Sequence, residues 1–200
     1  WNHMSEWVEN LTMENKYRSF LHPLRTIIAP PKETLKVWDE LNQKRKVIGI
    51  GGIDAHAHKY NLVGFLEVEI FPYKVLFKSI RTHILIDEAI KKGKSAKELE
   101  KAKWQIYNSL KDGRCFVAND YVAESKGFRF YAEFDDVKYQ MGDTIPDHKN
   151  VTFKVYLPGI TAEIKLLRNG HIIETNKGID AEFVEKKKGA YRIEVYHEDR

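Results

Sequence analysis

The sequence KVIGIGGIDAHAH, residues 46–58, decides the fold that we predict for this chain. After Lys46 it is an apolar run broken only by glycines, and it closes with a carboxylate and two imidazoles at alternate positions. Apolar runs without polar alternation are typical of strands that are buried on both faces of a parallel sheet. We therefore predict such a strand over residues 47–52. In α/β proteins the reactive groups lie at the carboxyl ends of these strands.

Asp54 and His56 follow the predicted strand directly. They stand two residues apart, so in an extended chain both side chains project to the same side. A hard carboxylate oxygen beside a neutral imidazole nitrogen suits a divalent metal ion. The alternative is structural: Asp54 would cap a following helix and His56 would be a polar loop residue. Even as ligands the pair is incomplete, because zinc takes about four ligands and harder ions about six.

The composition indicates a folded protein that binds neither nucleic acid nor membrane. The 200 residues suffice for one large or two small domains, and 42% are hydrophobic. The 33 basic and 29 acidic residues nearly balance, at a net charge of +4. Cys115 is the only cysteine, which excludes an internal disulfide and a cysteine zinc cluster. We predict a cytoplasmic protein, because no apolar run is long enough to span a bilayer.

Residues 1–125 carry an α/β pattern with a helical connection. A short helix over residues 19–28 is interrupted by Pro23, and a second helix over residues 32–44 has one apolar stripe. Because this second helix leads directly into the strand at 47–52, we predict the second half of a βαβ crossover.

The clearest helix of the chain begins after Ser95. Ser95 and Glu98 form a capping-box pattern, and Gly113 is placed to end the helix. The apolar positions predict a buried face, which consists of Leu99, Ala102, Ile106 and Leu110.

Residues 126–200 predict a β-sandwich of immunoglobulin-like type. Short alternating segments recur about every ten residues, and Asn169-Gly170 supplies a hairpin turn in which both residues need a positive φ. The predicted strands cover residues 127–134, 151–157, 162–167, 172–174, 179–184 and 191–196.

The chain resembles the PHP family, named for polymerase and histidinol phosphatase. GIGGIDAHAH, residues 49–58, and the preceding VWDEL, residues 37–41, are similar to the last metal motif of that family. The nearest branch is that of the CehA/McbA-like metallohydrolases. The Asp and His of the family motif Gly-Ser-Asp-x-His are metal ligands and correspond to Asp54 and His56, while Ile53 stands where serine is common.

The resemblance implies the remnant of a (β/α)7 barrel followed by the sandwich. Family members bind up to three divalent ions and hydrolyse phosphoesters, so we expect Zn, Mn or Fe as the cofactor of the complete enzyme. The family's other ligands would precede Trp1, and His3, His22 and His83 match no ligand position. We therefore interpret the chain as the C-terminal part of a longer protein, which by itself binds metal weakly and is inactive.

Two functions follow from these patterns. The first is the C-terminal portion of a metal-dependent phosphoesterase, which acts on a small phosphoester or related ester and uses Asp54 and His56 as terminal ligands. The second is a non-catalytic binding or interaction module, in which the sandwich binds a partner or a polysaccharide. A barrel remnant would expose strand edges and apolar surface, so we also expect the chain to self-associate or to bury that surface against the sandwich.

Overall fold

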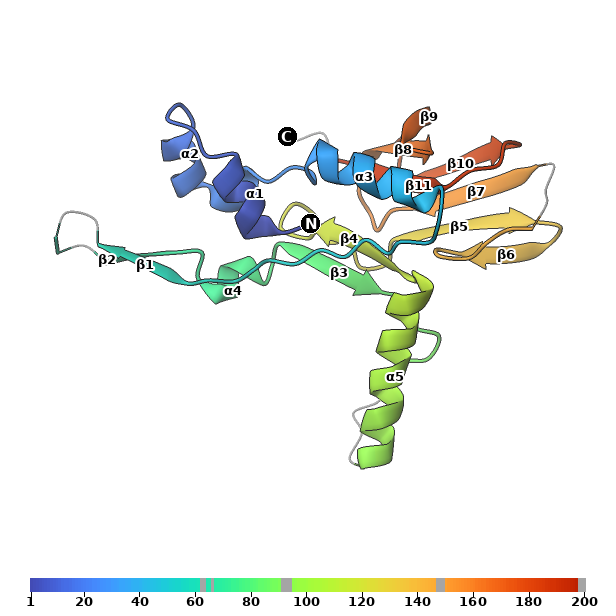
Figure 1. Ribbon diagram of the computed structural model, residues 1–200, viewed down its shortest axis with the longest axis horizontal. Coiled ribbons are helices and arrows are strands. Elements are labelled where there is room, and N and C mark those ends of the chain that lie inside the picture. Colours follow the sequence, from blue (N-terminus) through green and yellow to red (C-terminus); the bar gives the residue numbers. More distant parts are fainter. Residues whose placement is uncertain (62–63, 66, 91–94, 147–149, 198–200) are drawn as a thin grey trace.

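The structure is a computed structural model that describes residues 1–61, 64–65, 67–90, 95–146 and 150–197 (Figure 1). The side chains at 58, 60, 68 and 70 lie outside this description. The helices are α1 (His3–Glu9), α2 (Lys16–Leu21), the 3₁₀ turn η1 (Pro23–Arg25), α3 (Lys32–Asn42), α4 (Tyr73–Leu76) and α5 (Ala96–Asp112). The strands are β1 (His58–Asn61), β2 (Glu67–Ile70), β3 (Ile80–Ile84), β4 (Cys115–Asn119), β5 (Arg129–Phe134), β6 (Val137–Gln140), β7 (Val151–Tyr156), β8 (Ala162–Arg168), β9 (His171–Gly178), β10 (Asp180–Glu185) and β11 (Tyr191–Tyr196).

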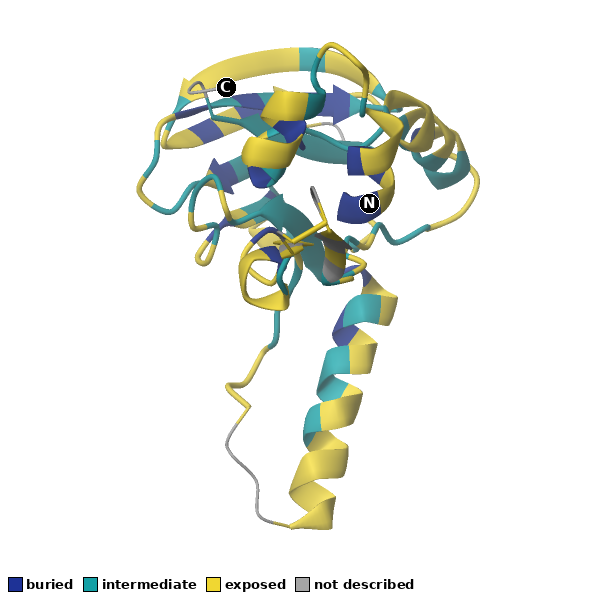
Figure 2. Ribbon diagram, turned by 90° about the vertical axis from the view of Figure 1, so that its left-hand side faces the viewer, coloured by how far each residue is buried: buried dark blue, intermediate teal, exposed yellow. Residues whose placement is uncertain are grey.

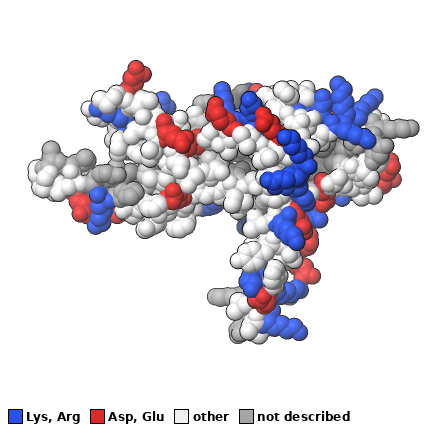
Figure 3. Space-filling model, viewed as in Figure 1, with Lys and Arg blue, Asp and Glu red and all other residues white. Residues whose placement is uncertain are grey.

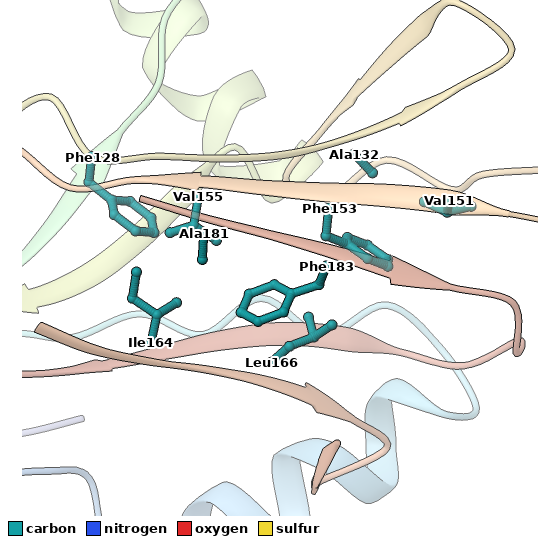
Figure 4. Packing of buried hydrophobic residues seen from close by; sticks show 9 residues of the cluster. All are labelled: Phe128, Ala132, Val151, Phe153, Val155, Ile164, Leu166, Ala181 and Phe183. Atoms are coloured by element: carbon teal, nitrogen blue, oxygen red, sulfur yellow. The ribbon is translucent and has the colours of Figure 1, made fainter. Parts of the chain in front are cut away.

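The C-terminal half is sandwich-like, as the sequence predicted. A four-stranded sheet of order β10-β7-β5-β6 faces a three-stranded sheet of order β11-β8-β9, with antiparallel pairing in both. Residues along β7 alternate between buried and more exposed, because successive side chains point to opposite faces. Figure 4 shows Phe153 and Phe183 of one sheet pointing toward Ile164 and Leu166 of the other. The immunoglobulin-like topology itself stays a prediction.

Two hairpin turns show how local sequence shapes the sandwich. Asn169 and Gly170 have φ values of 52° and 83°, which confirms the predicted turn between β8 and β9. The turn between β5 and β6 is formed by Asp135 and Asp136, with φ values of 47° and 61°. Aspartate tolerates this left-handed region, but it is a weaker turn signal than Asn-Gly, and the sequence analysis missed β6.

The segment at residues 47–52 is extended but is not the buried strand that we predicted. Ile50 is 63% exposed, and the β-pairing of the segment with other described residues is limited to one parallel bridge, Asn2 to Gly52. The bridge is bracketed by hydrogen bonds from the Gly52 amide to the Trp1 carbonyl (2.9 Å) and from the His3 amide to the Gly52 carbonyl (3.0 Å). The prediction was wrong because three glycines leave few side chains to bury. The described residues form no closed barrel, and the barrel remnant stays a prediction.

Gly51 is where this segment lies on the β3–β4 hairpin. A Cβ added to Gly51 would stand 2.4 Å from Val117 Cγ1 and 3.0 Å from Ile80 Cγ2, so only glycine fits without displacement. The Thr82 hydroxyl accepts a hydrogen bond from the Gly51 amide (2.9 Å) and donates one to the Gly51 carbonyl (2.7 Å). One side chain thus satisfies both backbone groups of a residue that has no ladder partner.

A bidentate ion pair joins α3 to the sandwich. Arg192 Nε and Nη2 of β11 lie 2.7 and 2.9 Å from the two carboxylate oxygens of Asp39, and both side chains are largely buried. The Cζ atom of the Arg192 guanidinium lies 5.8 Å from the centroid of the Trp38 ring. Because these partners are 153 residues apart in sequence, the pair fixes α3 against β11.

The N-terminal half has a small core and much exposed apolar surface. Its core gathers side chains from α1, η1, α4, β3 and the adjoining loops, namely Met4, Trp7, Leu24, Ile27, Phe71, Leu76 and Ile80. Other large apolar side chains of this half are exposed, among them Val8, Tyr17, Leu21 and Phe77. Figure 3 shows fewer charged side chains over α1 and α2 than over the sandwich end. The exposed apolar surface that we predicted is therefore present, whereas self-association stays a prediction.

Helix α5 has the predicted ends but not the predicted buried face. The capping box of Ser95 and Glu98 is formed, and Gly113 ends the helix with a φ of 78°. Leu99, however, is 60% exposed, because the N-terminal half of α5 projects away from the rest of the chain (Figure 2). Periodicity indicates which side of a helix is apolar, but not whether another element covers it.

The contact at Gly51 leads to a prediction about stability. We expect Gly51→Ala to lower the free energy of unfolding by about 1–3 kcal/mol, since the new methyl group would displace Val117 and Ile80. Gly52→Ala is the matched control, because a Cβ there meets no atom within 4 Å. Urea unfolding of both variants measures the difference. Equal stabilities would show that the segment does not lie on the hairpin as described.

Candidate metal-ligand site

Asp54 lies where the extended segment ends, in a constrained backbone conformation. Its φ of 47° is in the left-handed region, which aspartate tolerates better than most residues. The Asn2 side-chain amide donates a hydrogen bond to Asp54 Oδ2 (3.2 Å), and the Asp54 side chain is 44% exposed. No helix begins at Asp54, because the described residues 55–57 are irregular and lead into β1, so the alternative that Asp54 caps a helix is wrong.

His56 is oriented by the backbone of Asp54. The Nδ1 atom lies 2.7 Å from the Asp54 carbonyl oxygen, and a carbonyl can only accept a hydrogen bond. Nδ1 therefore carries the proton in the neutral ring, and Nε2 bears the lone pair. Metal-binding histidines commonly donate their second ring N–H to a backbone carbonyl in this way. The same Nδ1 lies 3.4 Å from Asp54 Oδ1, so the two side chains are neighbours, as predicted.

The pair is exposed, neighbouring and chemically suited to a divalent ion, but it supplies two ligand side chains. No group of three or more His, Cys, Asp or Glu residues among those described lies close enough together to hold a metal. The side chain of His58 lies outside the described residues. Asp54 and His56 would therefore hold an ion only together with further ligands, and Asn2 contacts the Asp54 carboxylate.

His83 belongs to a polar cluster that the sequence analysis missed. His83 Nε2 lies 2.8 Å from Asp120 Oδ2 and 3.0 Å from the Ser125 hydroxyl, which also donates to Asp120 Oδ1. Arg81 donates to the same carboxylate (3.1 Å), which is almost completely buried. In a Ser-His-Asp triad the serine and the aspartate use different imidazole nitrogens. Here Asp120 and Ser125 both contact Nε2 of His83, so the cluster is not a catalytic triad. It stabilises the loop that follows β4.

His3 is completely buried, and its second nitrogen has no partner among the described residues. Nδ1 lies 3.0 Å from the Ser79 hydroxyl, which itself donates to the Leu76 carbonyl (2.7 Å). Nδ1 must then be the donor to Ser79, and Nε2 carries an unsatisfied lone pair. Burial lowers the pKa of His3 to about 4, because a proton on Nε2 would place a charge away from water.

We compared the chain with family models, curated proteins and solved structures, and found no match in any of the three. No helix in the described part of the chain combines the length and the apolar character that a bilayer-spanning helix requires. The assignment of Asp54 and His56 therefore rests on their chemistry and on the contacts given above.

His3 leads to a prediction about pH dependence. The pKa is about 4 in the fold and 6.5 for an unperturbed imidazole, so the unfolded chain binds more protons between these values. The stabilisation from keeping His3 neutral is complete above pH 6.5 and decreases as the pH falls to about 4. As the pH falls across this range, the contribution of His3 to the free energy of unfolding decreases by about 3 kcal/mol.

Denaturant unfolding at a series of pH values measures this contribution. We expect His3→Gln to lose less stability than the unmodified chain between about pH 6.5 and pH 4, because the amide does not take up a proton. His22→Gln serves as the control, since His22 is exposed. Parallel pH profiles for the unmodified chain and His3→Gln would contradict the burial of a neutral His3.

Proposed function

We propose that Asp54 and His56 are ligands in the metal centre of a PHP-type, metal-dependent phosphoesterase. The observation that carries this proposal is the hydrogen bond from His56 Nδ1 to the Asp54 carbonyl, which leaves the lone pair on Nε2. Its support also includes the position of both residues at the end of the glycine-rich segment. The left-handed backbone at Asp54 adds to this, because strained conformations cluster at functional sites.

Each residue of the site has a distinct role in this proposal. Asp54 would bind the ion through a carboxylate oxygen and offset part of its charge, and in the ion-free chain that carboxylate accepts a hydrogen bond from the Asn2 amide. His56 binds through Nε2, while its N–H bond to the backbone fixes the ring orientation. A bound Zn, Mn or Fe ion supplies Lewis-acid activation of a phosphoester and of the attacking water.

The proposal assigns this chain part of a metal centre. Asp54 Oδ1 lies beside the protonated Nδ1 of His56, so binding of one ion by both residues requires rotation of a side chain. We expect weak metal binding by this chain, since a catalytic ion is held by three or more protein ligands. Hydrolysis then depends on ligands beyond those in the described residues.

Metal titrations of the purified chain test the proposal. We expect Zn²⁺ or Mn²⁺ to bind, and Asp54→Asn and His56→Gln each to weaken binding by about tenfold or more, since each removes one of two ligands. The matched controls are Asp180→Asn and His171→Gln, which remove the same groups from exposed positions on the sandwich. Isothermal titration calorimetry gives the dissociation constants.

The controls decide how the result is interpreted. Unchanged affinity in Asp180→Asn and His171→Gln would tie binding to the proposed site. If all four variants bind metal as tightly as the unmodified chain, or if no metal binds, Asp54 and His56 are not ligands. The function that then stands is the non-catalytic binding module.

A further inference from the structure

A hollow of about 510 Å³ lies on the outer face of the β10-β7-β5-β6 sheet. The C-terminal end of α5 approaches this sheet beneath β5 and β6 (Figure 1), where Gly113 packs against Gly142. The volume lies in the range of small-molecule sites. The sheet contributes Arg129, Tyr131, Lys138, Gln140 and Tyr156, and the segments flanking α5 contribute Leu85, Ile86, Asp87 and Arg114.

The hollow is positively charged. Arg114, Arg129 and Lys138 line it, against a single acidic residue, Asp87. Arg129 donates to the uncharged Phe128 carbonyl (2.9 Å), and Glu133, the cross-strand neighbour of Lys138, pairs with Lys154 (2.9 Å). The carboxylate nearest to Arg114 is that of Asp143, at 3.5 Å. The charge of the hollow is therefore only partly compensated by the protein.

The tyrosine rings show what kind of ligand this hollow suits. Lys138 Nζ lies 4.0 Å from the centroid of the Tyr131 ring, and the Tyr156 ring stacks on Tyr131 at 6.1 Å and 17°. Lys138 of β6 and Tyr156 of β7, the two strands that flank β5, therefore both contact the Tyr131 ring. The Tyr131 ring is thus already in contact with two side chains of its own sheet. The cations and hydrogen-bonding groups that line the hollow favour an anionic ligand.

We propose that this hollow binds a phosphate group through Arg114, Arg129 and Lys138. Guanidinium groups match the oxygens of a phosphate in a bidentate manner, and an ammonium group adds a point charge. The tyrosine hydroxyls and the Gln140 amide provide uncharged donors at the same hollow. The site uses none of the residues of the metal proposal, so either proposal can fail while the other stands.

A titration with inorganic phosphate at constant ionic strength tests this proposal, followed by NMR of the arginine side chains and the backbone amides. We expect shifts at Arg114, Arg129 and Lys138. The double variant Arg129→Gln, Lys138→Gln should bind phosphate about tenfold or more weakly, because it removes two of three cations. Lys165→Gln on the opposite sheet is the control for net charge and should change the affinity less than twofold.

Further variants and ligands separate the remaining outcomes. Arg129→Lys keeps the charge but not the bidentate geometry, so it should bind phosphate less tightly than the unmodified chain and more tightly than the double variant. Unchanged backbone amide shifts away from the hollow show that the double variant is folded. Shifts with phosphate but not with phosphatidic acid vesicles support a soluble phosphorylated ligand, and binding to vesicles as well supports a lipid phosphate. The absence of shifts, or equal phosphate affinity in the double variant and the unmodified chain, overturns the proposal.

Discussion

The absence of a side chain at Gly51 is the constraint on which the rest of the structure depends. It lets the segment from Lys46 to Ile53 lie directly on the β3–β4 hairpin. There the Thr82 hydroxyl forms hydrogen bonds with both the amide and the carbonyl of Gly51. At one end of the segment, Lys46 Nζ donates to the carbonyls of Asp112 (3.2 Å) and Gly142 (2.9 Å). At the other end the chain turns at Asp54. This segment therefore contacts α5 and the sandwich at Lys46 and leads at its other end to the candidate metal ligands.

The same segment is held from the N-terminal side by α3. Trp38 Nε1 donates to the Val47 carbonyl (2.8 Å), and the Trp38 ring lies against the position where Gly49 has no Cβ. Next to it, Asp39 pairs with Arg192 of the sandwich. A largely buried guanidinium without a partner would be strongly unfavourable, so this pair specifies how α3 docks. Two neighbouring residues of one helix thus connect the extended segment with the β-sheet.

The elements that the sequence predicted well are those defined by local chemistry. The bounds of α5 follow from the Ser95–Glu98 capping box and Gly113, and the β8–β9 hairpin follows from Asn169-Gly170. The prediction failed where the outcome depends on distant partners. An apolar run at 47–52 does not reveal whether strands flank it, and nothing near Asp39 in the sequence indicates Arg192.

The candidate site also combines features that the sequence predicted with features that depend on the three-dimensional fold. Its two residues are neighbours, as the spacing predicted, but the reason is the left-handed turn at Asp54 and not the alternation of a strand. The bond that selects the His56 tautomer is local, yet it depends on that turn and could not be predicted from residue spacing. The cluster of His83, Asp120 and Ser125 was missed because strand pairing brings together residues that are far apart in sequence.

Binding of a divalent ion by Asp54 and His56 can be observed by anomalous diffraction at the zinc edge, from crystals of this chain soaked with Zn²⁺. We expect an anomalous peak about 2.0–2.2 Å from a carboxylate oxygen of Asp54 and from Nε2 of His56. Peaks only at other residues, with the Asp54 and His56 side chains unchanged, would contradict it.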